Sequence, residues 1–95
     1  MVKRIVKFGA KLCVPCATFS KTFHKVEEME EFKEIKFEEV DIEEDEGIEA
    51  YIEKYGIKSI PTTLIFGRND ELIFKLSGSV SLEDFIEIIN DAIEK

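Results

Sequence analysis

The chain is poor in the residues that hold crosslinks and metal ions in small proteins. Its 95 residues include two cysteines, one histidine and no tryptophan. Cys13 and Cys16 are so close that a disulfide between them would add little stability to a fold. A structural zinc ion needs four nitrogen or sulfur ligands. The third candidate, His24, lies about two helical turns beyond Cys16 and cannot easily complete the same site, so we expect no metal and read His24 as an ordinary surface residue.

Long apolar runs are also missing. No stretch is long enough to cross a membrane, and four Lys or Arg residues interrupt the first eleven positions before the core of a signal peptide could form. We therefore expect a cytoplasmic protein with no membrane partner. Reductants keep thiols reduced in that compartment, where paired cysteines more often indicate catalysis or metal binding than a structural crosslink.

Acidic residues are absent from positions 1–26, which contain six Lys or Arg, whereas positions 27–53 hold fourteen of the 21 Asp and Glu. The net charge of −8 argues against a nucleic-acid partner, because a phosphate backbone favours a basic surface. We interpret the acidic run as a solvated surface, which favours a monomer. With no repeats or linkers, and with 44% apolar residues, the chain predicts a single domain over residues 1–95.

Hydrophobic spacing predicts alternating strands and helices. The expected elements are a strand over Val2–Phe8, a helix from Cys16 to about Glu31, a strand over Ile35–Ile42, a helix around Asp45–Tyr55, a hairpin of Thr62–Phe66 and Leu72–Leu76 joined by Gly67–Asp70, and a last helix capped by Ser81. This βαβαββα order predicts an α/β fold with a mixed four-stranded sheet and helices on both faces.

The Cys13-Val14-Pro15-Cys16 segment falls where the first strand gives way to the first helix. Pro15 suits the first turn of a helix, where its missing N–H costs nothing. Cys13 precedes the helix, whose dipole and unpaired N–H groups lower the pKa of a thiol from about 8.5 toward neutrality. Cys16, one turn deeper, is expected to be buried and to attack a mixed disulfide formed at Cys13. The pattern predicts Cys13 as nucleophile and Cys16 as resolving thiol.

Three segments together resemble the thioredoxin family: residues 6–16 with the two cysteines, residues 55–62 ending in Ile60-Pro61-Thr62, and Gly78 between the last strand and the last helix. The resemblance covers nearly the whole chain but lacks the N-terminal strand and helix of full-length thioredoxins, so a minimal, glutaredoxin-like core is expected. It implies a cofactor-free thiol-disulfide oxidoreductase that acts on disulfide-containing proteins. A thioredoxin-reductase-like or glutathione-based reductant would recycle it.

The same resemblance implies the supporting residues. Pro61 would be cis and packed against the cysteines, and the backbone of Ile60 would pair with an extended substrate as an added strand. Thr62, Gly78 and Leu12 would complete the substrate-binding surface. Leu12 stands where thioredoxins usually carry Trp, which puts the breadth of substrates in question.

Two further positions depart from the family pattern. Val14 replaces the usual Gly between the cysteines, so the redox potential is not fixed by the resemblance. Lys7 stands where thioredoxins keep a buried Asp, and Glu39 stands near its usual Lys partner. We hypothesise that this pair has been exchanged and forms a proton reservoir beneath Cys16. The alternative is that Lys7 extends to solvent from the strand end and Glu39 points to solvent.

Two other functions are compatible with the sequence. A glutaredoxin-like reductase would use glutathione directly. Ser77-Gly78-Ser79 only weakly resembles the Gly-Gly-containing glutathione site of that family. A binding module could instead hold a metal or cluster across a dimer, because two cysteines from each of two chains supply four ligands. Pro15 argues against this reading, since cluster-binding relatives tend to lack it.

Overall fold

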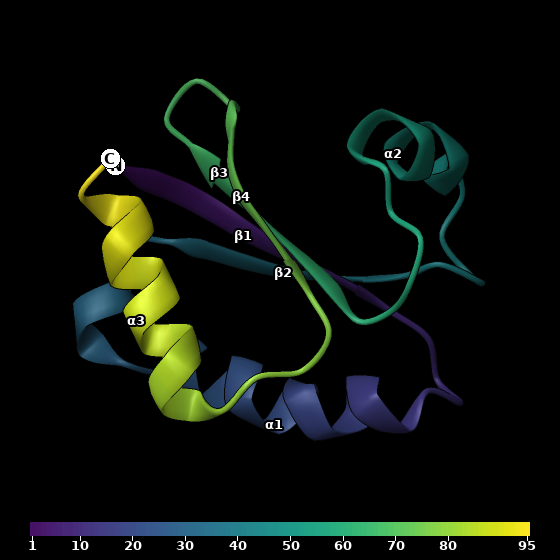
Figure 1. Cartoon of the computed structure of the whole chain (residues 1–95), viewed down its shortest axis with the longest axis horizontal. Helices are drawn as coiled ribbons and strands as arrows, with labels where there is room; N and C mark the ends of the chain where they lie inside the picture. The colour runs from purple at the N-terminus through teal and green to yellow at the C-terminus, as the bar shows by residue number, and fades with distance from the viewer.

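The computed structural model describes residues 1–95 and contains a four-stranded sheet with three α-helices (Figure 1). The elements are β1 (Val2–Gly9), α1 (Val14–Glu27), a short 3₁₀ helix (Glu30–Phe32), β2 (Lys36–Asp41), α2 (Ile48–Tyr55), β3 (Thr62–Gly67), β4 (Leu72–Ser77) and α3 (Leu82–Ile93). The predicted βαβαββα order is confirmed. None of the three α-helices combines the length and apolar character that crossing a bilayer requires.

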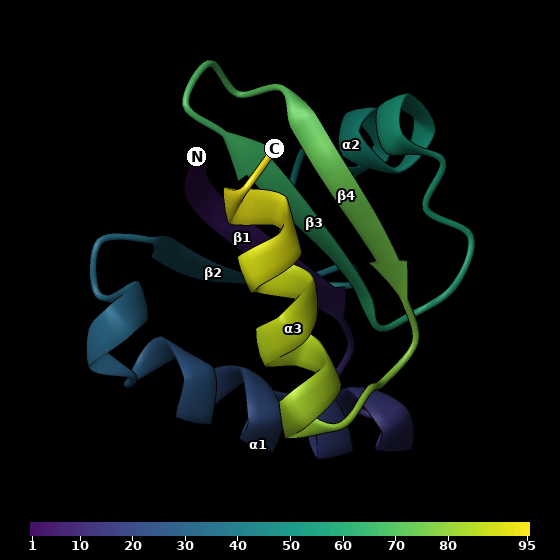
Figure 2. The same ribbon diagram turned by 60° about the vertical axis from the view of Figure 1, so that its left-hand side comes forward.

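The strands lie in the order β2-β1-β3-β4. β1 pairs with β2 in parallel and with β3 antiparallel, and β3 and β4 form an antiparallel hairpin, so the sheet is mixed as predicted. Helices α1 and α3 cover one face and α2 covers the other (Figures 1 and 2). Because β1 occupies an inner position and helices cover both faces of the sheet, residues 5–9 are buried.

The alternation of side chains along β1 divides the core into two clusters. Ile5 joins the larger cluster between the sheet and helices α1 and α3, which contains Phe19, Phe23 and Phe85. The rings of Phe19 and Phe85 meet edge to face, with centroids 5.0 Å apart. Phe8 belongs to the smaller cluster under α2. The site at the end of β1 therefore rests on packed aromatic side chains.

Two helix boundaries differ from the sequence-based prediction. Helix α1 ends at Glu27 rather than near Glu31, because the chain becomes extended at Met29 and then turns through the 3₁₀ helix, which buries Phe32. Helix α2 begins at Ile48 rather than Asp45. The Asp41 side chain accepts hydrogen bonds from following backbone N–H groups and forms a turn there instead.

Candidate active site

The two cysteines lie where β1 passes into α1, and they form a disulfide with a Cα–Cα distance of 5.2 Å. Cys13 is the N-cap residue of α1, and its Sγ accepts a hydrogen bond of 3.1 Å from the backbone N–H of Cys16. Pro15 occupies the first turn of the helix, as expected. In the reduced protein, the same N–H group and the helix N-terminus would stabilise a thiolate at Cys13.

The two sulfur atoms differ in their access to solvent. Cys13 is half-buried, whereas Cys16 is only 3% exposed. Leu12 and Val14, which flank Cys13, are 96% and 76% exposed. A large molecule can therefore reach Cys13 but not Cys16, and it would meet two apolar side chains around Cys13.

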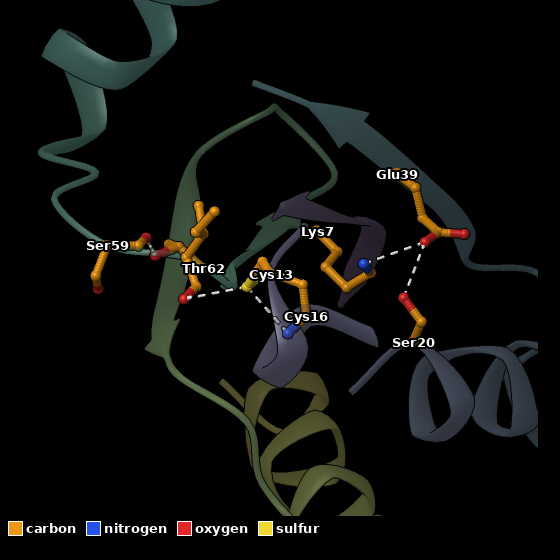
Figure 3. Close-up of a disulfide and its surroundings, with 8 residues drawn as sticks. Lys7, Cys13, Cys16, Ser20, Glu39, Ser59 and Thr62 are labelled. Atoms are coloured by element: carbon orange, nitrogen blue, oxygen red, sulfur yellow. Dashed lines mark hydrogen bonds and ion pairs between the residues drawn. A yellow bond between two sulfur atoms is a disulfide. The ribbon is translucent and has the colours of Figure 1, made fainter. Parts of the chain in front are cut away.

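The loop before β3 lies against the disulfide. The peptide bond between Ile60 and Pro61 is cis, and the carbonyl oxygen of Ile60 is 3.9 Å from the Sγ atom of Cys13. Figure 3 shows this loop on one side of Cys13, with Cys16 on the other. Ile60 is partly exposed, so its backbone lies beside the sulfur at the surface of the molecule.

Hydrogen bonds from both sides hold this loop in place. The hydroxyl of Thr62 donates to the carbonyl oxygen of Ser59 at 2.6 Å, and the N–H of Gly78 donates to the carbonyl oxygen of Pro61 at 2.8 Å. Gly78 has a φ of +89°, a conformation that glycine adopts without strain. The Thr62 side chain is buried, and its hydrogen bond to Ser59 stabilises the loop. A contact between Thr62 and substrate stays a prediction.

Lys7 and Glu39 are register partners on β1 and β2, and the structure brings their side chains together. The Nζ atom of Lys7 lies 3.1 Å from Oε2 of Glu39. The Lys7 side chain is only 5% exposed, so the alternative in which it extends to solvent is wrong. Glu39 keeps 42% of its side chain exposed. Figure 3 shows the two side chains pointing toward one another beside the disulfide.

Glu39 has a second partner. Its Oε1 atom is 2.5 Å from Nε2 of His24, and Ser20 Oγ lies 3.5 Å from its Oε2. Burial raises the pKa of the Glu39 carboxyl, but hydrogen bonds from His24 and Lys7, together with their charges, outweigh burial and hold that pKa below its ordinary value. The carboxyl is therefore ionised at neutral pH and supplies the negative charge that the buried ammonium of Lys7 needs.

The sequence interpretation missed the contribution of His24. It is a half-exposed residue on the helix surface, as expected, but it contacts Glu39 rather than solvent alone. The sequence contains a pattern that could indicate this contact, because Ser20 and His24 are four residues apart and so share one face of α1. That face could have been matched to the neighbouring strand β2, which carries Glu39.

An open cavity of about 440 Å³ adjoins Cys16, and its lining also includes Lys7, Gly9, Ser20 and Glu39. It opens between the end of β1 and the start of α1. No group of three or more His, Cys, Asp or Glu side chains in the chain is arranged to hold a metal ion. The chemistry available at this site within one chain is that of the two sulfur atoms and the charges beside them.

Comparisons with known proteins agree with this geometry. The family model described as Thioredoxin matches residues 2–91. A curated relative, the thioredoxin Asp f 29 of Aspergillus fumigatus, is 36% identical over 62 residues, which are 65% of this chain and 54% of that protein. The chain thus spans about half the length of this curated relative.

Solved structures share the fold. The thioredoxin Mala s 13 of Malassezia sympodialis superimposes with a TM-score of 0.78 at 22% identity, over 94% of this chain and 73% of that one. The thioredoxin of Trypanosoma brucei brucei gives a TM-score of 0.78 at 22% identity, over the whole of this chain and 77% of that one. At these identities the likeness supports the predicted α/β fold.

Proposed function

Because the chain belongs to the thioredoxin family, we propose that it is a thiol-disulfide oxidoreductase that reduces protein disulfides through Cys13 and Cys16. The observation that carries this proposal is the position of Cys13. Its sulfur caps α1, accepts the N–H of Cys16 and lies 3.9 Å from the carbonyl oxygen of Ile60 in the cis-proline loop. In the reduced protein this sulfur would be accessible, and the helix N-terminus and the N–H of Cys16 would stabilise its thiolate.

In the first step, the Cys13 thiolate of the reduced protein attacks one sulfur of a substrate disulfide. A bond forms between Cys13 Sγ and that sulfur, and the substrate S–S bond breaks. The other substrate sulfur leaves with the electron pair as a thiolate and takes a proton from solvent. The N–H of Cys16, which contacts Cys13 Sγ in the structure, stabilises the attacking thiolate.

In the second step, the Cys16 thiolate attacks Cys13 Sγ, and the bond between Cys13 and the substrate sulfur breaks. The substrate leaves as its second thiolate, having gained two electrons in all. The protein is left with the Cys13–Cys16 disulfide, which is the state present in the structure. A dithiol reductase or glutathione then returns two electrons to the pair.

The surface around Cys13 supports binding of extended segments of protein substrates. The partly exposed backbone of Ile60 could pair with such a segment as an added strand. The exposed side chains of Leu12 and Val14 offer apolar contact on the other side of the sulfur. Specificity in this proposal comes from backbone pairing and apolar contact rather than from a deep pocket.

We further propose that the protein acts in the cytoplasm as a monomer. The cytoplasm keeps thiols reduced, which suits an electron donor to disulfides. The net charge of −8 favours mutual repulsion between copies. Sedimentation of the purified protein tests the second point, and a dimer would overturn it.

The deciding experiment is a redox titration of the full chain in graded glutathione buffers, with free thiols counted at each point. A midpoint near about −270 mV supports a thioredoxin-type reductant, and one near about −200 mV or above moves the assignment to a glutaredoxin-like or oxidising role. Turnover with glutathione alone would also favour the glutaredoxin-like reading. If the cysteines do not interconvert reversibly, or the purified protein carries a coloured cluster, the proposal fails.

A further inference from the structure

Lys7 is an unusual residue for an inner strand of a covered sheet. Its side chain is 5% exposed, and an ammonium group removed from water is costly unless it has partners of opposite charge. Glu39 provides one such partner at 3.1 Å, and the ring of Phe23 lies on another side, with its centroid 5.9 Å from Nζ. An ammonium has three N–H donors, so the Glu39 carboxylate does not exhaust its capacity.

Gly9 lies close to both this ammonium and Cys16. A Cβ atom at position 9 would lie 3.2 Å from Sγ of Cys16 and 3.7 Å from Nζ of Lys7. Gly9 is not among the glycines with a positive φ, so its backbone does not require glycine. What requires glycine is space, because any side chain at this position would approach both the buried sulfur and the buried ammonium.

We propose that Lys7 is the fixed counter-charge of the Cys16 thiolate in the reduced protein, and that Gly9 leaves the gap through which the ammonium faces the sulfur. This inference rests on the proposed function, in which Cys16 must ionise in order to resolve the mixed disulfide. A buried thiol ionises poorly in apolar surroundings, and a nearby cation reverses that tendency. Lys7 acts through charge and is a positioning residue.

Water in the cavity beside Cys16 can accept the proton that Cys16 loses. The S–H bond of Cys16 breaks, and the proton passes to water in the open cavity of about 440 Å³ that both Cys16 and Lys7 line. Lys7 gives up no proton in this step and keeps its contact with Glu39. Glu39 therefore holds the ammonium in position, and His24 fixes the other carboxylate oxygen of Glu39.

Other titratable groups face the same cavity: Lys11 from the loop after β1, and Asp41 and Asp45 at the end of β2 and in the following turn. Lys11 pairs with Glu44 at 3.0 Å and is largely exposed, so solvent screens its charge. Asp41 and Asp45 both interact with backbone N–H groups of their own turn. Lys7 is the buried cation of this set.

The test uses the Cys13→Ser variant of the whole chain, in which Cys16 is the only thiol. The ionisation of Cys16 is titrated against pH and monitored through the Cβ chemical shift of this residue. Replacing Lys7 by Met keeps the length of the side chain and removes its charge. We expect the fraction of Cys16 present as thiolate at a fixed pH to fall about tenfold. Lys21→Met, which removes an exposed lysine from α1, is the matched control and should leave the titration unchanged. Equal titrations of the Lys7→Met protein and its parent would overturn the proposal.

Gly9→Ala provides a second variant that retains every charge. The added methyl group would intervene between sulfur and ammonium, so the Cys16 titration should move in the same direction as in Lys7→Met. This variant decides the matter if Lys7→Met does not fold, and an unmoved titration in it would then overturn the proposal. The titration does not depend on disulfide reduction, so an inactive native protein would overturn the proposed function and leave this result interpretable.

Discussion

The two cysteines at the start of α1 have opposite surroundings. Cys13 faces outward, between exposed apolar side chains and a backbone carbonyl, and its activating partner is a backbone N–H. Cys16 is 3% exposed and lines a cavity together with Lys7, whose ammonium is held by the Glu39 carboxylate. The difference shows how one helical turn separates an accessible cysteine from a buried one.

The largest effect is expected when each of the two cysteine sulfurs is removed in turn. We expect Cys13→Ser to lose all detectable reduction of protein disulfides, because no accessible nucleophile remains. Cys16→Ser should still attack but should accumulate a mixed disulfide with the substrate, since nothing resolves it. Mass spectrometry of the non-reduced reaction mixture distinguishes the two. A mixed disulfide on Cys13→Ser rather than on Cys16→Ser would reverse the assigned roles.

A pair of truncations separates the packed side of the site from the open side. Phe19→Ala, in the aromatic cluster behind the start of α1, should lower the free energy of unfolding by about 3–5 kcal/mol. Leu12→Ala should change it by less than about 0.5 kcal/mol, because this side chain is exposed. Leu12→Ala should instead raise KM for a protein substrate while kcat is little changed. Urea unfolding and steady-state kinetics measure both, and a large loss of stability in Leu12→Ala would contradict this division.

The contribution of Glu39 can be tested through the pH dependence of protein stability. The contacts of Glu39 hold its carboxyl pKa below the ordinary value of 4.5, so its contribution to stability is present above that pH and is lost as the pH falls through the lowered value in the folded protein. Glu39→Gln should therefore be less stable than the native protein at neutral pH, and the difference should shrink in acid. Thermal unfolding across this range measures it. A difference that is constant with pH would contradict the assignment, and Glu34→Gln, an exposed neighbour, is a suitable control.

The smallest expected effect concerns Thr63, the register partner of Lys7 on β3. Its hydroxyl is the buried side-chain polar atom for which the structure provides no hydrogen-bond partner. Thr63→Val keeps the shape and removes this group, so it should stabilise the protein by up to about 1 kcal/mol. Thr22→Val, on the partly exposed surface of α1, is the comparison. Clear destabilisation by Thr63→Val alone would show that the hydroxyl is engaged.

Much of the fold could be predicted because local pattern and tertiary environment agree. Val2–Phe8 and Thr62–Phe66 are rich in β-branched and aromatic residues, and both become inner strands covered on two sides. Helix α3 begins where Ser81 accepts the N–H of Asp84, as its sequence indicates. These elements needed no knowledge of distant partners.

Parts of the site could not be read in this way because they depend on contacts between distant segments. The Lys7–Glu39 pair follows as a hypothesis only from the family resemblance, because it depends on the register of β1 against β2, which sequence spacing alone does not determine. The contact of His24 with Glu39 depends on how α1 lies across the sheet. The need for space at Gly9 appears only once Cys16 and Lys7 are both in place.

The position of β2 at the edge of the sheet has a consequence for behaviour at high concentration. An edge strand offers unpaired backbone groups to which another chain can add, and this is a common start of aggregation. Here the exposed edge carries Lys36, Glu38, Glu39 and Asp41, and charged side chains disfavour such pairing. The strand that supplies the partner of the buried lysine thus also disfavours the addition of another chain at its own edge of the sheet.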